Sequence, residues 1–246
     1  NTLEVTASDL EMTLKTSIAI EDVQEEGEIA VPAKLLTDSL KEFPDLPLQF
    51  STEANEDILN ISWMSGASKI PFFPADDYPA LPELGDMAIS ATFPSPILLT
   101  GINNTIYATA EDEIRPVMNG IFFDMTPEST TLVATDSHKL VYYTRNDVKA
   151  AEKCSFILPK KPAAILRTLL GKSDDIVKVT FDMKNAYFEF EGNILICRLQ
   201  EGTYPAYRSV IPKNNPNKLV ISRVQLLNAV KRVAVCSNQS TSHVKL

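Results

Sequence analysis

Three consecutive residues, Asp136, Ser137 and His138, are of the types that make up a hydrolase triad. A triad requires its three side chains to meet in space, and adjacent side chains on a strand or turn diverge. No glycine-rich nucleophile elbow surrounds Ser137, and the chain contains only two histidines. The sequence therefore disfavours hydrolysis, and we expect no catalytic residue and no enzymatic activity.

Metal and cofactor sites have equally little support in the sequence. Asp136 and His138 have no further ligands at a metal-binding spacing, and Cys154, Cys197 and Cys236 are far apart and form no CxxC pair. No GxxxxGK[ST] phosphate-binding loop occurs. We expect no metal and no cofactor, and the sparse, odd cysteine count is typical of a reducing cytoplasm.

The elements that must position any functional side chain are arranged as an internal repeat. Four short segments recur in the same order at nearly one spacing, which is the length of a domain. The matched segments are 7–10 with 134–137, 31–32 with 158–159, 78–80 with 204–206, and 98–99 with 226–227, at spacings of 127, 127, 126 and 128 residues.

The repeat predicts three modules. We expect the first at residues 1–84 without its N-terminal part, a complete second module at 85–212, and the start of a third at 213–246. The chain is thus expected to be a piece of a longer protein with three copies.

Each module is predicted to be mostly antiparallel strands with two helices, an α+β class. Alternating apolar residues and β-branched or aromatic runs indicate the strands. An apolar stripe indicates a helix at 33–43, and Pro162 is expected at the first position of a second helix that ends at Gly171. The predicted strands are 12–20, 132–134, 140–143, 177–181, 187–190 and 194–199, and the further helices are 95–110 and 223–236.

Charge is distributed unevenly along a chain whose net charge is −9. Residues 1–84 carry 4 cationic and 17 acidic side chains, residues 85–212 carry 13 and 15, and residues 213–246 carry 6 and none. A negative net charge does not at first suggest a nucleic-acid binder, because phosphate contacts need Lys and Arg, but the distribution of charge matters more than its sum. The distribution is compatible either with an ordinary solvated surface or with acidic and basic modules that meet head to tail.

Several segments together resemble the bacterial DNA sliding clamps, the beta subunits of the replicative polymerase. Residues 134–140, ATDSHKL, are similar to the clamp segment ATDGHRL, and residues 204–212, YPAYRSVIP, are similar to FPDYRRVLP. Residues 3–10 and 113–120 resemble further clamp segments, as does Ser237-Asn238 after the third-copy helix. The resemblance extends over essentially the whole chain.

This resemblance implies a fold and a function. Repeated clamp modules have helices inside and antiparallel sheets outside, and two chains close head to tail around duplex DNA. The expected partners are double-stranded DNA, held without regard to sequence, and polymerase and clamp-loader subunits, held through short apolar peptides. The alternative is a repeat-built peptide-binding scaffold with no role on DNA.

The resemblance also implies three sets of functional residues. Phosphate contacts are independent of sequence, so basic side chains on the inner helices are expected to face DNA: Lys34, Lys160, Lys161, Arg167 and Arg232. The partner-peptide pocket is expected at Arg115, Thr135, His138, Lys139, Leu140, Pro205 and Val210. The dimer interface is expected at Ile70, Val235 and Cys236, which are otherwise ordinary core residues.

Three positions depart from the family pattern within or beside the expected pocket. Ser137 stands where Gly is usual, and Lys139 and Ser209 stand where Arg is usual. Lysine cannot reproduce the planar fork of arginine, so the contacts at the rim are expected to differ.

Overall fold

The computed structural model describes residues 1–53, 56–237 and 244. Its contacts divide the chain into two compact units, residues 1–205 and residues 206–246. Residues 206–212, which the sequence assigns to the second module, belong to the second unit, so the predicted module end at 212 stays a prediction.

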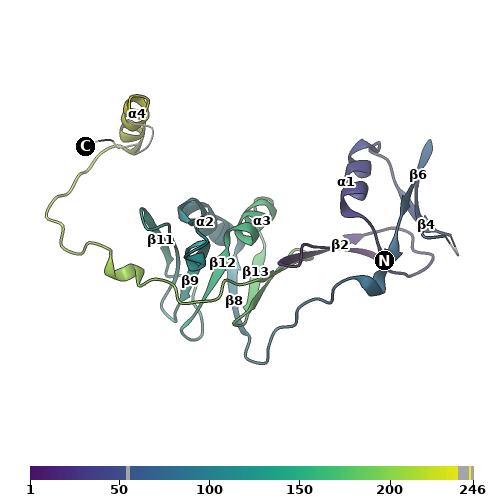
Figure 1. Ribbon diagram of the computed structural model, residues 1–246, viewed down its shortest axis with the longest axis horizontal. Helices are drawn as coiled ribbons and strands as arrows, with labels where there is room; N and C mark the ends of the chain where they lie inside the picture. The colour runs from purple at the N-terminus through teal and green to yellow at the C-terminus, as the bar shows by residue number, and fades with distance from the viewer. Residues whose placement is uncertain (54–55, 238–243, 245–246) are drawn as a thin grey trace. The chain divides into compact units, whose positions relative to one another are not determined.

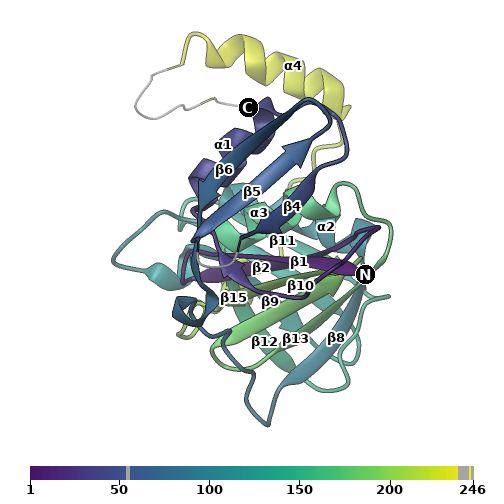
Figure 2. The ribbon, with the colours of Figure 1, turned by 90° about the vertical axis from the view of Figure 1, so that its right-hand side faces the viewer.

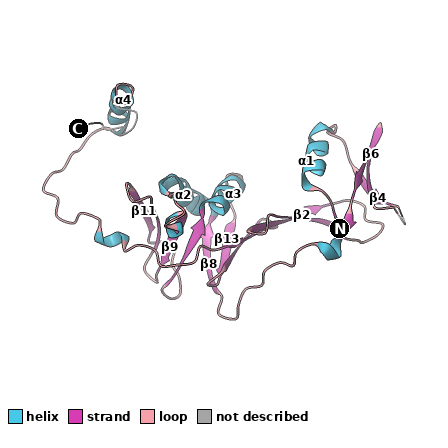
Figure 3. Cartoon of the chain, viewed as in Figure 1, coloured by secondary structure: helices cyan, strands magenta, loops and turns pink. Residues whose placement is uncertain are grey.

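The first unit holds strands and helices of two successive modules (Figure 3). Those of the first module are β1 (Thr2–Ser8), β2 (Met12–Ala19), β3 (Ile29–Ala30), α1 (Ala33–Glu42), β4 (Gln49–Thr52), β5 (Ile58–Trp63), β6 (Gly66–Pro71), β7 (Phe73–Pro74) and η1 (Ala75–Asp77). Those of the second are β8 (Ile89–Pro94), α2 (Ser95–Thr105), η2 (Ile106–Ala108), η3 (Pro116–Met118), β9 (Gly120–Met125), β10 (Thr130–Thr135), β11 (Leu140–Arg145), β12 (Cys154–Pro159), α3 (Lys160–Leu170), β13 (Ile176–Phe181), β14 (Asn185–Phe190) and β15 (Asn193–Arg198).

The described residues of the second unit form a short 3-10 helix, η4 (Tyr207–Ser209), and an α-helix, α4 (Arg223–Ala234). The Ser222 hydroxyl caps α4 by accepting from the Gln225 backbone N–H at 3.5 Å. Serine is among the preferred residues at this position because its oxygen satisfies a backbone donor that has no partner within the helix.

The internal repeat is confirmed in the order and spacing of the elements. Strand β14 starts and ends 127 residues after β5, and β15 starts and ends 127 residues after β6. Helix α3 begins 127 residues after α1, and α4 begins 128 residues after α2. The predicted α+β class of repeated modules is therefore correct.

The two modules of the first unit share one sheet. Six strands pair in the order β1-β2-β15-β14-β13-β8, so that β2 of the first module lies against β15 of the second (Figure 2). In this antiparallel pair Leu14 lies opposite Leu195, and the Thr16 hydroxyl donates to the Asn193 side-chain oxygen at 2.7 Å. The module boundary is thus bridged by a ladder of backbone hydrogen bonds, which tolerates many side-chain changes.

A single large core holds the second module together. Helices α2 and α3 lie next to each other on one side of the sheets (Figure 1) and bury Leu98, Ile102, Leu166 and Leu170. The strands contribute alternate residues to the same core, because successive side chains on a strand point to opposite faces. Their largest fully buried side chains include Phe93, Phe123 and Phe188.

Three helices of the first unit begin directly after a proline, which for α2 and α3 is also the last residue of a strand. Pro32, Pro94 and Pro159 precede α1, α2 and α3, with φ near −60° in each. The expectation that Pro162 opens the helix is wrong, because α3 begins two residues earlier, at Lys160. Proline is tolerated there because the first backbone N–H groups of a helix have no acceptor within it. Gly171 ends α3 as predicted.

The shared sheet gives a prediction for stability. We expect Leu195→Ala to lower the free energy of unfolding by about 2–5 kcal/mol, because Leu195 is fully buried beside the β2–β15 junction and truncation leaves a cavity. The control is Leu219→Ala, since that side chain is 67% exposed and its loss should change stability by less than about 0.5 kcal/mol. Urea denaturation followed by circular dichroism measures both variants, and equal losses would contradict the packing described above.

Candidate functional site

Residues 135–140 form a tight turn between β10 and β11, here called the Asp136 turn. It contains Asp136, Ser137 and His138, the residues whose types match a hydrolase triad. The Asp136 carboxylate accepts from the backbone N–H groups of His138 at 3.0 Å and Lys139 at 2.9 Å. The Thr135 hydroxyl donates to the Lys139 carbonyl at 2.7 Å. These bonds satisfy backbone groups within the turn, which connects two paired strands.

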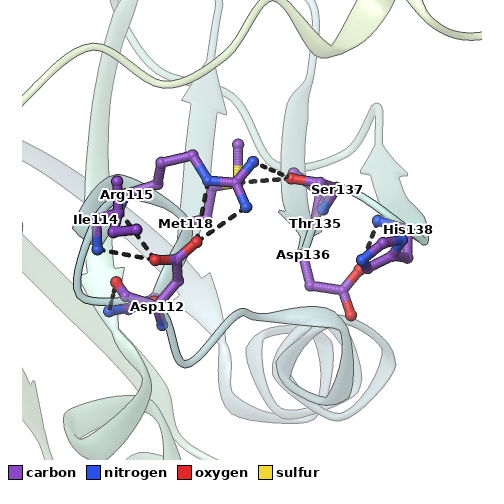
Figure 4. Close-up of polar contacts among 9 residues, drawn as sticks. Asp112, Ile114, Arg115, Met118, Thr135, Asp136, Ser137 and His138 are labelled. Atoms are coloured by element: carbon purple, nitrogen blue, oxygen red, sulfur yellow. Dashed lines mark hydrogen bonds and ion pairs between the residues drawn. The ribbon is translucent and has the colours of Figure 1, made fainter. Parts of the chain in front are cut away.

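Ser137 adopts a left-handed backbone conformation in this turn, with φ of 76°. The left-handed region suits glycine, and a residue with a Cβ pays roughly 1–2 kcal/mol of conformational free energy to adopt it. The Ser137 hydroxyl accepts a hydrogen bond from Arg115 Nη1 at 2.6 Å and donates to the Met118 sulfur at 3.5 Å (Figure 4). The departure from glycine therefore adds a contact to Arg115 that glycine cannot make.

Arg115 is held from its other side by Asp112. Its Nε lies 3.0 Å and its Nη2 lies 2.9 Å from Asp112 Oδ2 (Figure 4). Asp112 also accepts from the Ile114 backbone N–H at 2.8 Å. That backbone bond and the Arg115 guanidinium lower the pKa of Asp112. The guanidinium is thus fixed between a carboxylate and the Ser137 hydroxyl instead of being free in solvent.

The segment that leaves β15 is fixed beside these residues. The Tyr204 ring stacks on Phe122 of β9 with the ring centres 4.7 Å apart, and burial raises the pKa of Tyr204 to about 12. Gly202 has φ of 126°, and a Cβ there would lie only 2.6 Å from Val117 of η3. Glycine is therefore required for this close approach, which leads the chain into half-buried Pro205.

Six of the seven predicted pocket residues lie in the first unit, on three segments. Arg115 precedes η3, Pro205 follows Tyr204, and Thr135, His138, Lys139 and Leu140 belong to the Asp136 turn. Thr135 is buried, Leu140 is half-buried, and His138 and Lys139 are exposed. The seventh, Val210, lies in the second unit next to η4 and is 69% exposed.

Asp136, Ser137 and His138 are not arranged as a triad. The Asp136 carboxylate bonds the His138 backbone and pairs with the Lys139 ammonium, while the Ser137 hydroxyl bonds Arg115 and Met118. Within the described residues no group of three or more His, Cys, Asp or Glu side chains could hold a metal ion. No helix in the described part of the chain is long and apolar enough to cross a membrane.

The first module contains the same turn 127 residues earlier, at residues 8–13, here called the Asp9 turn. Asp9 accepts from the backbone N–H groups of Glu11 at 3.1 Å and Met12 at 2.8 Å, and Leu10 has φ of 73°. The Leu10 N–H donates to the Ser8 hydroxyl at 3.2 Å, as the Ser137 N–H does to Thr135 at 3.1 Å. The predicted equivalence of Asp9 and Asp136 is confirmed bond by bond.

Of the predicted DNA-facing residues of α3, Lys161 and Arg167 are exposed and Lys160 is half-buried, whereas Ala163, Leu166 and Leu170 are buried. Lys160 Nζ lies 2.5 Å from Glu111 Oε1, and Lys161 forms an ion pair with Asp9. These contacts lower the pKa of Glu111 and of Asp9, with the lysine hydrogen bond as the largest cause in each. Arg167 is exposed and has no ion pair within the described residues.

The remaining predicted cations lie on other helices. Lys34 on α1 occupies the repeat position of Lys161 and is exposed. Arg232 is exposed in the last turn of α4, in the second unit.

The predicted interface residues lie on β6 and just after α4. Ile70 lies on β6, an edge strand as expected, and its side chain is 1% exposed and packs in the core of the first module with Leu59 and Ile61. Its place at an interface stays a prediction. Val235 is 86% exposed and Cys236 is exposed, both directly after α4.

The ion pair within the Asp136 turn gives a prediction for pH dependence. The Lys139 side chain is the largest cause of the lowered pKa of Asp136. We expect Lys139→Met, which installs the residue of the Asp9 turn, to raise the Asp136 titration midpoint toward 3.8. Because the folded pKa lies below the unfolded value, this carboxylate stabilises the fold above pH 3.8, and the stabilisation is lost as pH falls toward the folded pKa. Carboxyl ¹³C NMR across pH 1–6 measures the midpoint, and an unchanged midpoint would contradict the ion pair.

Comparison with known proteins places both modules in one family. Residues 1–82 match the family model for the DNA polymerase III beta subunit, N-terminal domain, and residues 92–206 match that for its central domain. The beta sliding clamp of Synechococcus elongatus is 28% identical over 252 residues, covering 99% of this chain and 65% of that protein. The Escherichia coli beta sliding clamp is 27% identical over 248 residues, covering 100% and 66%.

Solved structures agree with the sequence matches. The DNA polymerase III subunit beta of Pseudomonas aeruginosa superposes with a TM-score of 0.89 at 28% identity, over 97% of this chain and 65% of that one. The sliding clamp of the same organism bound to griselimycin superposes with a TM-score of 0.90 at 27% identity, over 98% and 65%. The chain thus spans about 65% of the length of these relatives, and it belongs to the DNA polymerase III beta subunit family, the beta sliding clamps.

Proposed function

We propose that the protein containing this chain is a DNA sliding clamp, a non-catalytic ring that encircles duplex DNA and tethers the replicative polymerase. The observation that carries the proposal is the family match over two successive modules, which are related by a 127-residue repeat. The proposed modules are residues 1–84, 85–212 and the beginning of a third at 213–246. A tether of this kind needs no cofactor, and the cysteines, all free, suit a reducing cytoplasm.

Duplex DNA is proposed to face the exposed sides of the helices. A clamp must hold DNA without reading it, so its contacts should be to phosphates, from Lys and Arg. Arg167 is free of ion pairs among the described residues, whereas Lys160 and Lys161 each have a carboxylate partner. A phosphate would have to compete with Glu111 or Asp9 for these lysines, so Arg167 should give the clearest electrostatic effect. Lys34 and Arg232 complete the proposed set.

Partner proteins are proposed to dock a short apolar peptide at the Asp136 turn. Leu140 and Pro205 supply half-buried apolar surface, and Arg115 supplies a fixed polar rim. Val210 in the second unit, with Thr135, His138 and Lys139, completes the proposed set. Burial of one large apolar side chain contributes roughly 1.5–3 kcal/mol, so two or three such side chains bind a peptide weakly enough for partners to exchange. Weak, exchangeable binding suits a tether that serves the polymerase and the clamp loader in turn.

Ring closure is proposed to use the free edge of β6 in a head-to-tail homodimer. Strand β6 occupies the repeat position of β15, and β15 pairs along its outer edge with β2 of the preceding module. A strand of the β2 type from a second chain could pair with β6 in the same antiparallel manner. Ile70, Val235 and Cys236 remain the proposed residues of this interface.

The DNA proposal is tested by Arg167→Gln in a three-module protein that contains this chain. The variant should weaken retention on circular duplex DNA, because each lost phosphate contact lowers the slope of log affinity against log salt by about 0.9. The matched control is Lys178→Gln on β13, whose side chain projects from the opposite face of the strand to core residues Val177 and Val179. Filter retention between 50 mM and about 300 mM salt measures the slope. Equal slopes for both variants would refute the proposed DNA-facing surface, and no retention of the parent protein would refute the clamp function.

The peptide proposal is tested by Leu140→Asp in the same three-module protein. A charge at this half-buried position should abolish calorimetrically detected binding of polymerase-derived peptides, while DNA retention stays at the parent level. Leu219→Asp, at a 67% exposed position, serves as the control for the added charge. Unchanged peptide affinity in Leu140→Asp would place the docking site elsewhere, and loss of both activities would indicate misfolding.

A further inference from the structure

The Arg115 guanidinium, the cation predicted for the rim of the peptide pocket, already has partners within the chain. Its Nε and Nη2 lie 3.0 Å and 2.9 Å from Asp112 Oδ2, and its Nη1 donates to the Ser137 hydroxyl at 2.6 Å (Figure 4). Arginine has five N–H donors, so one on each terminal nitrogen remains for a ligand. The Arg115 side chain is 49% exposed, which leaves room for a ligand to accept from them.

Asp112 is held in place by bonds of its own. Its Oδ1 accepts from the Ile114 backbone N–H at 2.8 Å. Its backbone N–H and carbonyl bond the Asn119 side-chain amide at 2.9 Å and 3.0 Å. An ion pair on a fixed carboxylate loses less side-chain entropy than one between two mobile side chains, so the Asp112–Arg115 pair should persist when a ligand arrives.

The segments that form the proposed pocket in the first unit, residues 111–118, 135–140 and 200–205, leave no described cation unpaired. Glu113 is exposed and has no ion pair within the described residues. A carboxylate on a peptide would therefore meet one unmatched negative charge and no unmatched positive one. The ion pairs that involve these segments are Arg115–Asp112, Lys139–Asp136, Lys160–Glu111 and Arg198–Glu201.

We propose that Asp112 and Ser137 make the peptide pocket select a neutral hydrogen-bond acceptor, such as an amide carbonyl, over a carboxylate at the position that meets Arg115. The inference rests on the proposed peptide docking and adds the selectivity of that site. Asp112 cancels the charge of Arg115, and Ser137 fixes the direction of its guanidinium. Arg115 then acts as a directed donor and not as a counter-ion. A carboxylate would lose its water without gaining an unpaired cation, whereas an amide carbonyl loses less on burial.

The test compares two capped tripeptides of nearly the same shape, acetyl-Asn-Leu-Phe-amide and acetyl-Asp-Leu-Phe-amide, which differ by one charge. Each is titrated into the three-module protein labelled with ¹³C at the methionine methyl groups. The Met118 signal is followed, because the Met118 sulfur contacts the Ser137 hydroxyl. We expect the Asn peptide to bind about threefold more tightly than the Asp peptide.

Three variants separate the roles of the residues. Asp112→Asn should raise the affinity for the Asp peptide, relative to the Asn peptide, by about threefold, because Arg115 is then unpaired. The matched control Glu113→Gln removes the same charge from the same segment without touching Arg115, and it should change this ratio less. Ser137 is a positioning residue, so Ser137→Ala should weaken the Asn peptide more than the Asp peptide. A merely structural defect would weaken both peptides equally and leave their ratio unchanged.

Each outcome separates the selectivity from the docking itself. Equal affinities in the parent protein, or a preference for the Asp peptide, overturn the inference and leave the proposed docking standing. Equal changes of the ratio in Asp112→Asn and Glu113→Gln also overturn it, because net charge alone would then set the selectivity. If neither peptide shifts Met118, or if Leu140→Asp binds both as the parent does, the proposed docking site fails as well. The signal of Met125, which is fully buried in the core, reports whether each variant retains its fold.

Discussion

The antiparallel pairing of β2 with β15 is the interaction on which the arrangement of the first unit depends. It joins residues about 180 positions apart, as in the Thr16–Asn193 hydrogen bond, and converts two separate sheets into one of six strands. The same pairing carries the Asp9 turn to the start of α3, where Asp9 meets Lys161. The first module's β2 and the second module's β15 are held in one register, with Leu14 opposite Leu195.

The two aspartate turns show how a repeat can keep its backbone and change its chemistry. Both turns close with the same carboxylate-to-backbone bonds and the same left-handed third residue. In the second module the carboxylate pairs with Lys139 of its own turn, whereas in the first module Met12 leaves Asp9 to pair with Lys161 of the next module. One substitution thus changes a local ion pair into a link between modules.

Much of this architecture could be predicted from the sequence, because it is repeated and periodic. Strands such as β2 and β13 alternate apolar and polar residues, and the 127-residue spacing transfers an assignment from one module to the next. Contacts between distant residues could not be predicted in the same way. Glu111 and Lys160 are 49 positions apart and no local pattern relates them. Asp112 was missed although its spacing of three from Arg115 is a signal that could have identified the pair.

Pro162 and Ile70 illustrate what a residue's general preference leaves undetermined. Pro162 was assigned to the start of a helix on its general preference, but Pro159 already ends β12 and the next residue enters the helix. Ile70 lies on an edge strand, yet a strand edge is defined by backbone groups, and its side chains still alternate between the core and the solvent. A residue on an edge strand can therefore have a buried side chain, and its exposure must be established separately from its position in the sheet.

The free edges of β6 and β11 have a consequence for the behaviour of the chain in solution. Among the described strands, β11 is an outer strand of its sheet and corresponds to β2 in the repeat, while the outer strand β6 corresponds to β15. Each of these two edges is therefore one half of a junction of the β2–β15 kind. A contact between such different edges is heterologous, so copies joined through it either close on themselves or continue as an open filament. A closed arrangement leaves none of the joined edges available for further growth, whereas an open one leaves an unpaired edge at each end.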